Sequence, residues 1–382
     1  MRVGVIGGGQ LARMMIPPAI ALGIELRVLA EESGGSAALA ATAVGDYRDA
    51  ETVLAFARDV DVVTFDHEHV PQAVLAALAA TGVPIRPGPQ ALEVAQDKLL
   101  MRARLDAIGV PVPDWAPVRD RAELDAFLRD HGGVAVVKTP RGGYDGKGVR
   151  IVRSADAVDD WFAVLDEHAS GSALLAEEWV GFRRELAQLA ARRPSGQFAA
   201  WQLVETVQRD GVCAEVFAPA PGAGVLVDDA RELAEVIAER LDVTGVLAVE
   251  LFETDDGRLL VNELAMRPHN TGHWTIDGAV TSQFENHLRG VLGLPLGATD
   301  ARASWSVMVN ILGGPSGATM PDRYRAAFAD RPEIKFHSYA KASRPGRKVG
   351  HVNAYGDDLD DCLERARHAA AWFRGDLGNE SE

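Results

Sequence analysis

The sequence predicts a soluble multidomain protein of the α/β and α+β classes, with an open parallel α/β (Rossmann-like) domain at its N-terminus. Its 382 residues are enough for two to four domains at roughly 100 to 200 residues each. Short β-branched runs alternate with helical segments over the first quarter of the chain, which is typical of a parallel sheet. Later strand runs are separated by hairpin turn signals, which indicate antiparallel sheets.

The N-terminal elements follow from this alternation. A first strand, Arg2–Ile6, ends in Gly7-Gly8-Gly9 and leads into an Ala-rich helix that Pro17-Pro18 shortens or kinks. Further strands are expected at Glu25–Leu29, Val60–Phe65 and Pro84-Ile85, and helices at Ala50–Arg58, Pro71–Ala80 and Gln90–Ile108. Val110-Pro111-Val112-Pro113 then indicates a linker. We place the N-terminal domain at residues 1–97.

The rest of the chain divides into three further units. A small subdomain, 98–176, is expected to hold helices Glu123–His131 and Asp156–His168 and strands Val134–Lys138 and Val149–Val152. A larger unit, 177–300, is expected to hold strands within Leu174–Val180, Glu185–Ala191, Phe198–Val207 and Val246–Glu263 and a helix at Arg231–Leu241. A small C-terminal domain, 301–374, follows with strands Ser304–Ile311, Glu333–Tyr339 and Val349–Ala354 and helix Asp358–Phe373, and 375–382 is a tail.

Charge and composition exclude several classes of protein. The net charge is −16, with 55 acidic against 39 basic side chains, which disfavours binding to nucleic-acid phosphates or anionic lipid. No apolar run approaches the roughly 18 residues of a membrane span. Cys213 and Cys362 are far apart and lack metal-site spacing. We expect a cytoplasmic protein with small-molecule partners and neither nucleic acid nor membrane.

The first glycine motif leaves three readings open. Gly7–Ala12 fits G-x-G-x-x-A between a strand and a helix, and Glu31 and Glu32 follow about 20 residues later. The motif is compatible with a dinucleotide, with another phosphate ligand, or with a bare tight turn. A nicotinamide or flavin enzyme is therefore a rival interpretation.

A second glycine-rich segment favours polyphosphate binding. Lys138 ends a strand, and Lys147 lies in the flexible glycine loop that follows it. Such a loop could close over a ligand as a lid, or it could be a solvated surface hairpin. The Walker A pattern is absent.

Two carboxylates mark a candidate metal site. If Asp256-Gly257 is a two-residue turn, Glu263 pairs directly with Glu250 across a hairpin. Opposed like charges destabilise a sheet unless a cation lies between them, and oxygen ligands with Asn262 adjacent suit Mg²⁺ better than zinc. The alternative is a solvated hairpin face.

Three loops carry further polar side chains. Arg267–Thr275 concentrates an Arg, two His and an Asn directly after the hairpin, which favours a polar substrate. Lys341–His351 is basic in an acidic protein and suits a phosphate clamp. Asp66-His67-Glu68-His69 follows the carboxyl end of a strand, where open α/β sheets bind ligands, although it could equally begin a helix.

Taken together, five segments closely resemble the ATP-grasp family of 5-(carboxyamino)imidazole ribonucleotide synthases of purine biosynthesis, over about residues 1 to 373. They are Gly9-Gln10-Leu11, Gly143-Tyr-Asp-Gly-Lys-Gly148, Asn262-Glu263-Leu264, Arg267-Pro-His-Asn-Thr-Gly-His-Trp274 and Arg344-Pro-Gly-Arg-Lys-Val-Gly-His351. The first two suggest ATP-grasp in general, and the last two point to this member. The resemblance implies an ATP-grasp fold.

The resemblance also implies roles for individual residues. ATP would be bound by Lys98, Lys138, Gly143, Tyr144, Asp145, Gly146, Lys147, Gly148, Val149, Glu177, Glu178, Trp179, Val180, Glu185, Gln208, Asn262 and Glu263. The ribonucleotide would be bound by Gly9, Gln10, Leu11, Glu68, His269, Asn270, His273, Lys341, Arg347 and Lys348. Arg267 and Lys348 would be catalytic, and Glu250 and Glu263 would hold Mg²⁺. The chain departs from the family pattern at Thr206 and Gln208, where an Asn and a His are usual, and at the Glu-rich segment replaced by Asp66–His69.

The implied reaction is ATP- and bicarbonate-dependent carboxylation of 5-aminoimidazole ribonucleotide through carboxyphosphate. The family is typically homodimeric, and its labile product makes a handover to the downstream mutase plausible. Two other interpretations remain beside the dinucleotide enzyme: a nucleotide-sensing scaffold without turnover, and an ATP-grasp ligase with another acceptor.

Overall fold

A computed structural model describes residues 1–142, 148–167, 172–315 and 319–377 of the chain. Gly143, Tyr144, Asp145, Gly146 and Lys147 of the expected phosphate loop lie outside the described residues, as do 378–382 of the expected tail. Among the described residues, no helix is both long and apolar enough to cross a bilayer.

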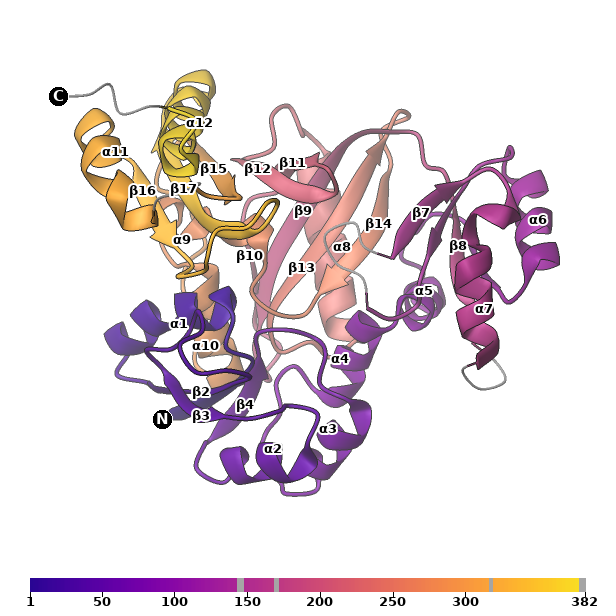
Figure 1. The fold of residues 1–382 in the computed structure, drawn as a ribbon, viewed down its shortest axis with the longest axis horizontal. Coiled ribbons are helices and arrows are strands. Elements are labelled where there is room, and N and C mark those ends of the chain that lie inside the picture. The colour runs from indigo at the N-terminus through magenta and orange to yellow at the C-terminus, as the bar shows by residue number, and fades with distance from the viewer. Residues whose placement is uncertain (143–147, 168–171, 316–318, 378–382) are drawn as a thin grey trace.

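The N-terminal domain is a four-stranded parallel sheet in the order β3-β2-β1-β4. Its strands are β1 (Arg2–Ile6), β2 (Glu25–Ala30), β3 (Ala41–Val44) and β4 (Val62–Phe65). Helices α2 (Ala50–Ala57) and α3 (Gln72–Ala79) cover one face. The other face is covered by α1 (Gln10–Ala21) and by α10 (Gln283–Leu292), which comes from far along the chain (Figure 1).

A small antiparallel sheet in the order β5-β8-β6-β7 lies at the right of Figure 1, and we call the unit built on it the lid. Its strands are β5 (Trp115–Val118), β6 (Ala135–Lys138), β7 (Val149–Val152) and β8 (Leu174–Glu178). Helix α6 (Arg121–Asp130), the 3₁₀ turn Ala155–Val158 and α7 (Asp159–Glu167) complete it. Their apolar side chains form one core with the strands.

A nine-stranded sheet is the centre of the molecule, with the path β14-β13-β9-β11-β12-β15-β17-β16 and with β10 paired to β9. Its strands are β9 (Phe182–Arg192), β10 (Phe198–Ala200), β11 (Val204–Arg209), β12 (Val212–Ala218), β13 (Gly245–Thr254), β14 (Leu259–Ala265), β15 (Trp305–Leu312), β16 (Lys335–Ser338) and β17 (Lys348–Gly356). Because β12 pairs with β15, the strands after residue 301 continue this sheet.

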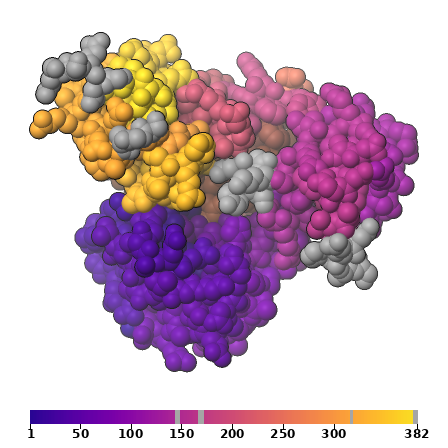
Figure 2. Space-filling model, in the orientation of Figure 1, coloured from indigo at the N-terminus to yellow at the C-terminus, as the bar shows by residue number. Residues whose placement is uncertain are grey.

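Two helices pack on one face of the large sheet, over different strands. Helix α8 (Leu226–Arg240) covers β9, β13 and β14, and α12 (Leu359–Arg374) covers β12, β15 and β17. The short helices α9 (Thr275–Gly278) and α11 (Tyr324–Asp330) lie beside the part of the sheet that β15, β16 and β17 form. Figure 2 shows the N-terminal, lid and C-terminal segments converging near the middle of one face.

Several expected elements differ in the structure. The helix expected at Gln90–Ile108 is two helices, α4 (Pro89–Gln96) and α5 (Lys98–Ala107), because extended Asp97 caps the second by accepting from the N–H groups of Leu99 and Leu100. Pro84-Ile85 makes only an isolated bridge to Val63. Elements β3, β5, β12, α9, α10 and α11 were not expected.

Candidate active site

The predicted carboxylate pair is present, although the hairpin that makes it differs from the expected one. Glu250 and Glu263 are direct partners across β13 and β14. The turn has three residues, Asp255–Gly257, since the N–H of Thr254 donates to the carbonyl of Arg258. A register shift after Glu250, at Asn262 on the facing strand, compensates for the extra turn residue.

The bulge also decides where the polar side chains point. Val261 and Leu264, on either side of Asn262 and Glu263, both pack in the core under α8. Asn262 and Glu263 are half-buried between them. The bulge therefore presents two consecutive polar residues away from that core, beside Glu250.

The pair is electrostatically suited to a cation. Burial first, and then the charges of Glu263 and Glu185, raise the pKa of Glu250 to about 8. A divalent ion between the two carboxylates would relieve this repulsion. Among the residues that the structure describes, no cluster of three or more His, Cys, Asp or Glu could hold a metal. Two carboxylates and an amide fit Mg²⁺, which commonly takes its remaining ligands from phosphates and water.

Lys138, at the end of β6, reaches from the lid to the hairpin. Its Nζ lies 2.7 Å from Oε2 of Glu177 and 3.3 Å from Oδ1 of Asn262. Burial opposes the charged form of Glu177, but Lys138 and Arg102 outweigh it and lower the pKa of this carboxyl. The structure thus brings a predicted phosphate-binding lysine beside the carboxylate pair.

The other predicted ATP residues surround this point. Nζ of Lys98 donates to the carbonyl of Gly142 at 3.0 Å, at the start of the glycine loop, and Gly148 closes the base of that loop by accepting from Thr139. Burial raises the pKa of Glu185, which accepts a hydrogen bond from Gln208. The remaining members are Val149 in β7, Glu178 bonded to the N–H of Asp114, half-exposed Trp179 and buried Val180.

The loop after β14 joins this site to the N-terminal domain. Nε of Arg267 lies 2.8 Å from Oε2 of Glu68. Nε2 of His269 lies 3.5 Å from Oε1 of Glu250, and burial with the nearby charges of Arg267 and Lys348 holds the pKa of His269 well below its usual value. His269 is therefore a neutral imidazole against the carboxylate pair.

Asn270 and His273 of the same loop lie deeper. Oδ1 of Asn270 accepts from Nδ2 of Asn310 at 3.2 Å. His273 is completely buried, with Nδ1 against Nε2 of Gln283 at 3.0 Å and its ring beside His351. The His273 side chain packs beneath the loop rather than on its surface.

The basic loop lies over the start of α1. Nζ of Lys341 donates to Oε1 of Gln10. Lys348 begins β17, and its charge acts on Glu250 and His269. Arg347 is half-buried and donates to the carbonyl of Ala342 at 3.3 Å. Gln10, Lys341 and Lys348 thus come together with the Arg267 loop, whereas Leu11 is in the N-terminal core.

The glycine turn after β1 holds a carboxyl of the protein itself. Oδ2 of Asp66 accepts from the N–H of Gly9 at 2.6 Å, and Oδ1 accepts from that of Ala12 at 2.9 Å. Burial raises the pKa of Asp66, and the two N–H donors and Arg267 oppose that shift. The helix N-terminus, where a dinucleotide would place its pyrophosphate, is occupied. This geometry argues against the dinucleotide interpretation.

Comparison with known proteins decides between the remaining interpretations. Three family models match: a ribonucleotide synthetase preATP-grasp domain over residues 1–96, an ATP-grasp domain over 103–284 and a phosphoribosylaminoimidazole carboxylase C-terminal domain over 306–365. The N5-carboxyaminoimidazole ribonucleotide synthase of Mycobacterium tuberculosis is 53% identical over 380 residues, 97% of this chain and 87% of that protein. The chain belongs to this synthase family.

Other relatives agree. The N5-carboxyaminoimidazole ribonucleotide synthase of Corynebacterium ammoniagenes is 48% identical over 96% of this chain and 91% of that protein. The synthetase structure from Thermus thermophilus is 37% identical, with a TM-score of 0.84 over 99% of this chain and 100% of that chain. The Aspergillus clavatus synthase, solved with ADP and 5-aminoimidazole ribonucleotide, is 31% identical with a TM-score of 0.86 over 97% and 98%. The predicted ATP-grasp fold and ligase class are confirmed.

Some contributors to the synthase site were not predicted from the sequence. Asp66 lies at the carboxyl end of β4, where a ligand was expected, and its carboxylate instead caps α1. Gln283 holds the loop by accepting from the N–H of His269 and contacting His273. Arg102 lies buried on the apolar side of α5 between Met101 and Leu105. A charged residue at an apolar helix position was the one available signal for it.

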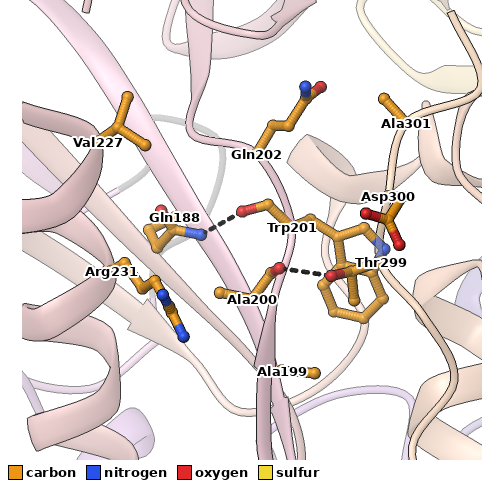
Figure 3. A pocket seen from close by; sticks show the side chains of 10 residues that line it. All are labelled: Gln188, Ala199, Ala200, Trp201, Gln202, Val227, Arg231, Thr299, Asp300 and Ala301. Atoms are coloured by element: carbon orange, nitrogen blue, oxygen red, sulfur yellow. Dashed lines mark hydrogen bonds between the residues drawn. The ribbon is translucent and has the colours of Figure 1, made fainter. Parts of the chain in front are cut away.

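One described cavity lies away from these residues. It has a volume of about 430 Å³ and is lined by β9, β10 and the segment after it, α8 and residues 299–301 (Figure 3). Gln188 pairs with Val249, which packs against α8, so this lining residue is on the opposite side of the sheet from Glu250. In Figure 3, Gln188 bonds the carbonyl of Trp201 and Thr299 bonds that of Ala200.

Proposed function

We propose that the chain carboxylates the exocyclic amine of 5-aminoimidazole ribonucleotide in de novo purine biosynthesis, using ATP and bicarbonate and passing through carboxyphosphate. The products are 5-carboxyamino-1-(5-phosphoribosyl)imidazole, ADP and phosphate. Family membership supports this assignment, as does the relative solved with ADP and the ribonucleotide.

One observation carries the proposal: the loop Arg267–Thr275, which we call the acceptor loop, touches the β13–β14 hairpin that carries Glu250 and Glu263, which we call the metal hairpin. Nε2 of His269 lies 3.5 Å from Glu250, while Arg267 of the same loop bonds Glu68 of the N-terminal domain. A phosphoryl group held at the hairpin and an acceptor held by the loop would therefore be neighbours. Transfer of an activated carboxyl group needs this proximity.

ATP is held on the lid side of the site. Lys98, Lys138 and the glycine loop neutralise its phosphates, and Glu177–Val180, Glu185 and Gln208 line the adenosine pocket. Glu250 and Glu263, with Asn262 beside them, would hold Mg²⁺. When bound, this ion neutralises charge on the phosphoryl oxygens. The opposed carboxylates support this assignment, since a cation between them would relieve their repulsion.

The ribonucleotide is held on the other side. Gln10, with Gly9 and Leu11 of its turn, and Glu68 come from the N-terminal domain. His269 and Asn270 come from the acceptor loop, with His273 supporting it. Lys341, Arg347 and Lys348 bind the substrate phosphate through charge-assisted hydrogen bonds. These residues come from three parts of the chain, so they form one site only in the folded protein, which supports the assignment.

The chemistry has two steps. A bicarbonate oxygen attacks the γ-phosphorus, the bond to ADP breaks, and carboxyphosphate forms. Carboxyphosphate then releases phosphate and yields CO₂, which bonds to the amine nitrogen as that nitrogen loses a proton. Arg267 stabilises the anionic intermediate, and Lys348 assists by holding charge near the same point. The lid excludes water from the labile intermediate.

The first test is phosphate release from ATP, Mg²⁺ and bicarbonate, with and without 5-aminoimidazole ribonucleotide. Release that requires the ribonucleotide supports both the ligase chemistry and the acceptor. Release that ignores the ribonucleotide points to another acceptor. No release with either mixture refutes the proposal in favour of a sensor.

The resemblance further supports a cytoplasmic homodimer that passes its labile product to the downstream mutase. Light scattering of the purified protein tests the dimer, since a monomer at all micromolar concentrations contradicts it. Faster conversion with added mutase than independent rates allow would support the handover, and additive rates would count against it.

A further inference from the structure

Arg102 is a charged side chain with no exposed surface in the middle of α5. Its Nε lies 2.5 Å from Oε1 of Glu177, and its Nη2 donates to the backbone carbonyl of Asn262 at 2.7 Å. Within the described part of the chain, Nη1 is buried without a hydrogen-bond partner. One guanidinium thus connects α5, the lid strand β8 and the bulge in β14.

Stability alone does not account for this arrangement. A buried ion pair is commonly no better for stability than apolar side chains of the same volume. Met101 and Leu105, beside Arg102 on α5, are apolar and belong to the core under α8. An apolar residue at position 102 would extend that core.

Arg102 instead sets the net charge around Glu177. Glu177 shares its carboxylate between Arg102 on Oε1 and Lys138 on Oε2. The three groups together carry one net positive charge, from two cations and one anion. Without Arg102, Glu177 would neutralise Lys138, and the group would carry no net charge to attract a phosphate.

The second contact of Arg102 acts on the hairpin. The Asn262 carbonyl that it holds lies in the bulge that presents Asn262 and Glu263 beside Glu250. Lys138 contacts the side chain of the same Asn262. Arg102 therefore fixes both the lysine and the metal hairpin relative to α5.

We propose that Arg102 is a positioning residue for ATP: it shares the Glu177 carboxylate with Lys138, so that the three groups keep one net positive charge for phosphate, and it holds the bulged hairpin in place. This inference rests on the proposed function, because it assumes that Lys138 binds nucleotide phosphate. Arg102 itself touches no reacting atom.

The test compares three variants of the full-length enzyme. Arg102→Gln keeps hydrogen-bond donors but removes the charge, and Arg102→Lys keeps the charge. Arg104→Gln is the matched control, because Arg104 is exposed on the same helix. We measure the Kd for ADP with Mg²⁺ by calorimetry, the KM values for ATP and for the ribonucleotide, kcat, and the thermal midpoint.

We expect Arg102→Gln to raise the Kd for ADP and the KM for ATP by about tenfold or more, as the loss of one nearby positive charge predicts. The KM for the ribonucleotide should stay within about twofold, since the lost charge lies on the ATP side. Arg102→Lys keeps the charge without the planar fork, so it should bind ATP more tightly than Arg102→Gln but more weakly than wild type. A merely structural role would instead change both KM values together with the thermal midpoint.

A folded Arg102→Gln enzyme with unchanged ATP affinity would overturn the inference. So would a folded Arg102→Lys enzyme that loses about tenfold in ATP affinity, even if the Gln variant does not fold. ADP binding by the wild type and by Arg104→Gln tests the proposed function separately from the role of Arg102. If neither binds ADP, the ATP site itself is wrong.

Discussion

Replacing Gly9 with Ala tests the contact between the glycine turn and Asp66. A Cβ on Gly9 would lie 2.1 Å from Oδ2 of Asp66 and 3.1 Å from its Cγ. Gly9 has φ −82° and ψ −165°, a conformation open to any residue, so backbone strain plays no part. The added methyl group acts on the protein only by displacing the carboxyl.

The cost follows from what the carboxyl would lose. Asp66 accepts two hydrogen bonds, from Gly9 at 2.6 Å and from Ala12 at 2.9 Å. Leaving a buried polar group unsatisfied costs roughly 1–3 kcal/mol, so losing both bonds with partial relaxation should cost about 3 kcal/mol. The shift should also disturb Glu68 and Gln10, raising the KM for the ribonucleotide more than that for ATP.

Gly88→Ala is the matched control. Gly88 also precedes a helix as its N-cap, with φ −66° and ψ 159°, but its added Cβ would meet only Oε1 of Gln90, at 3.9 Å. Urea unfolding followed by circular dichroism gives the free energy of unfolding of each variant, and phosphate release gives the KM values. If the two variants lose the same stability within about 0.5 kcal/mol, the Asp66 contact is not what requires glycine.

Three further predictions follow from the site and the core. Glu263→Ala should abolish ATP turnover with an unchanged circular dichroism spectrum, and near-normal phosphate release in excess Mg²⁺ would refute the metal role. Lys348→Ala should raise the KM for the ribonucleotide by roughly tenfold through loss of a charge-assisted contact, and an unchanged KM would remove the phosphate clamp. Burial lowers the pKa of His287 from 6.5 to about 3, so the unfolded chain binds a proton that the folded chain rejects. The free energy of unfolding should therefore fall by about 1.4 kcal/mol per pH unit from this residue as the pH drops below 6.5, and His287→Gln should flatten the measured slope by that amount.

The sequence predicted the elements whose burial follows from their own pattern. The β-branched runs of β1, β2 and β4 and the helices between them are apolar and lie close to their expected bounds. Helix α10 was missed because Gln283, Asn286 and His287 are all buried on it and interrupt its apolar pattern. Tertiary partners satisfy these side chains: Asn286 bonds Gly297, and His287 bonds Thr64 and the N–H of Val246.

Strand β12 was missed for the same kind of reason. Glu215 in its centre is completely buried, which no local pattern predicts. Arg209 bonds its Oε1 at 2.7 Å, and Arg367 of α12 bonds both oxygens at 2.8 and 2.7 Å. Such partners come from elsewhere in the chain, so the sequence of β12 alone cannot reveal that the Glu215 carboxylate is buried.

In the β13–β14 hairpin, the pairing of Glu250 with Glu263 was predicted correctly, but the backbone that produces it was not. Counting outward from a two-residue turn pairs Glu250 with Glu263, and so does a three-residue turn followed by one bulged residue. The two backbones differ in where Asn262 points: a regular strand would alternate it to the face opposite Glu263. The bulge places both beside Glu250, and it brings the Asn262 carbonyl to Arg102 and its amide to Lys138. If this is why the bulge exists, inserting one turn residue after Asp256 or removing Asn262 should change ATP affinity far more than ribonucleotide affinity. Equal losses for both substrates would mean that the bulge serves only to restore the register.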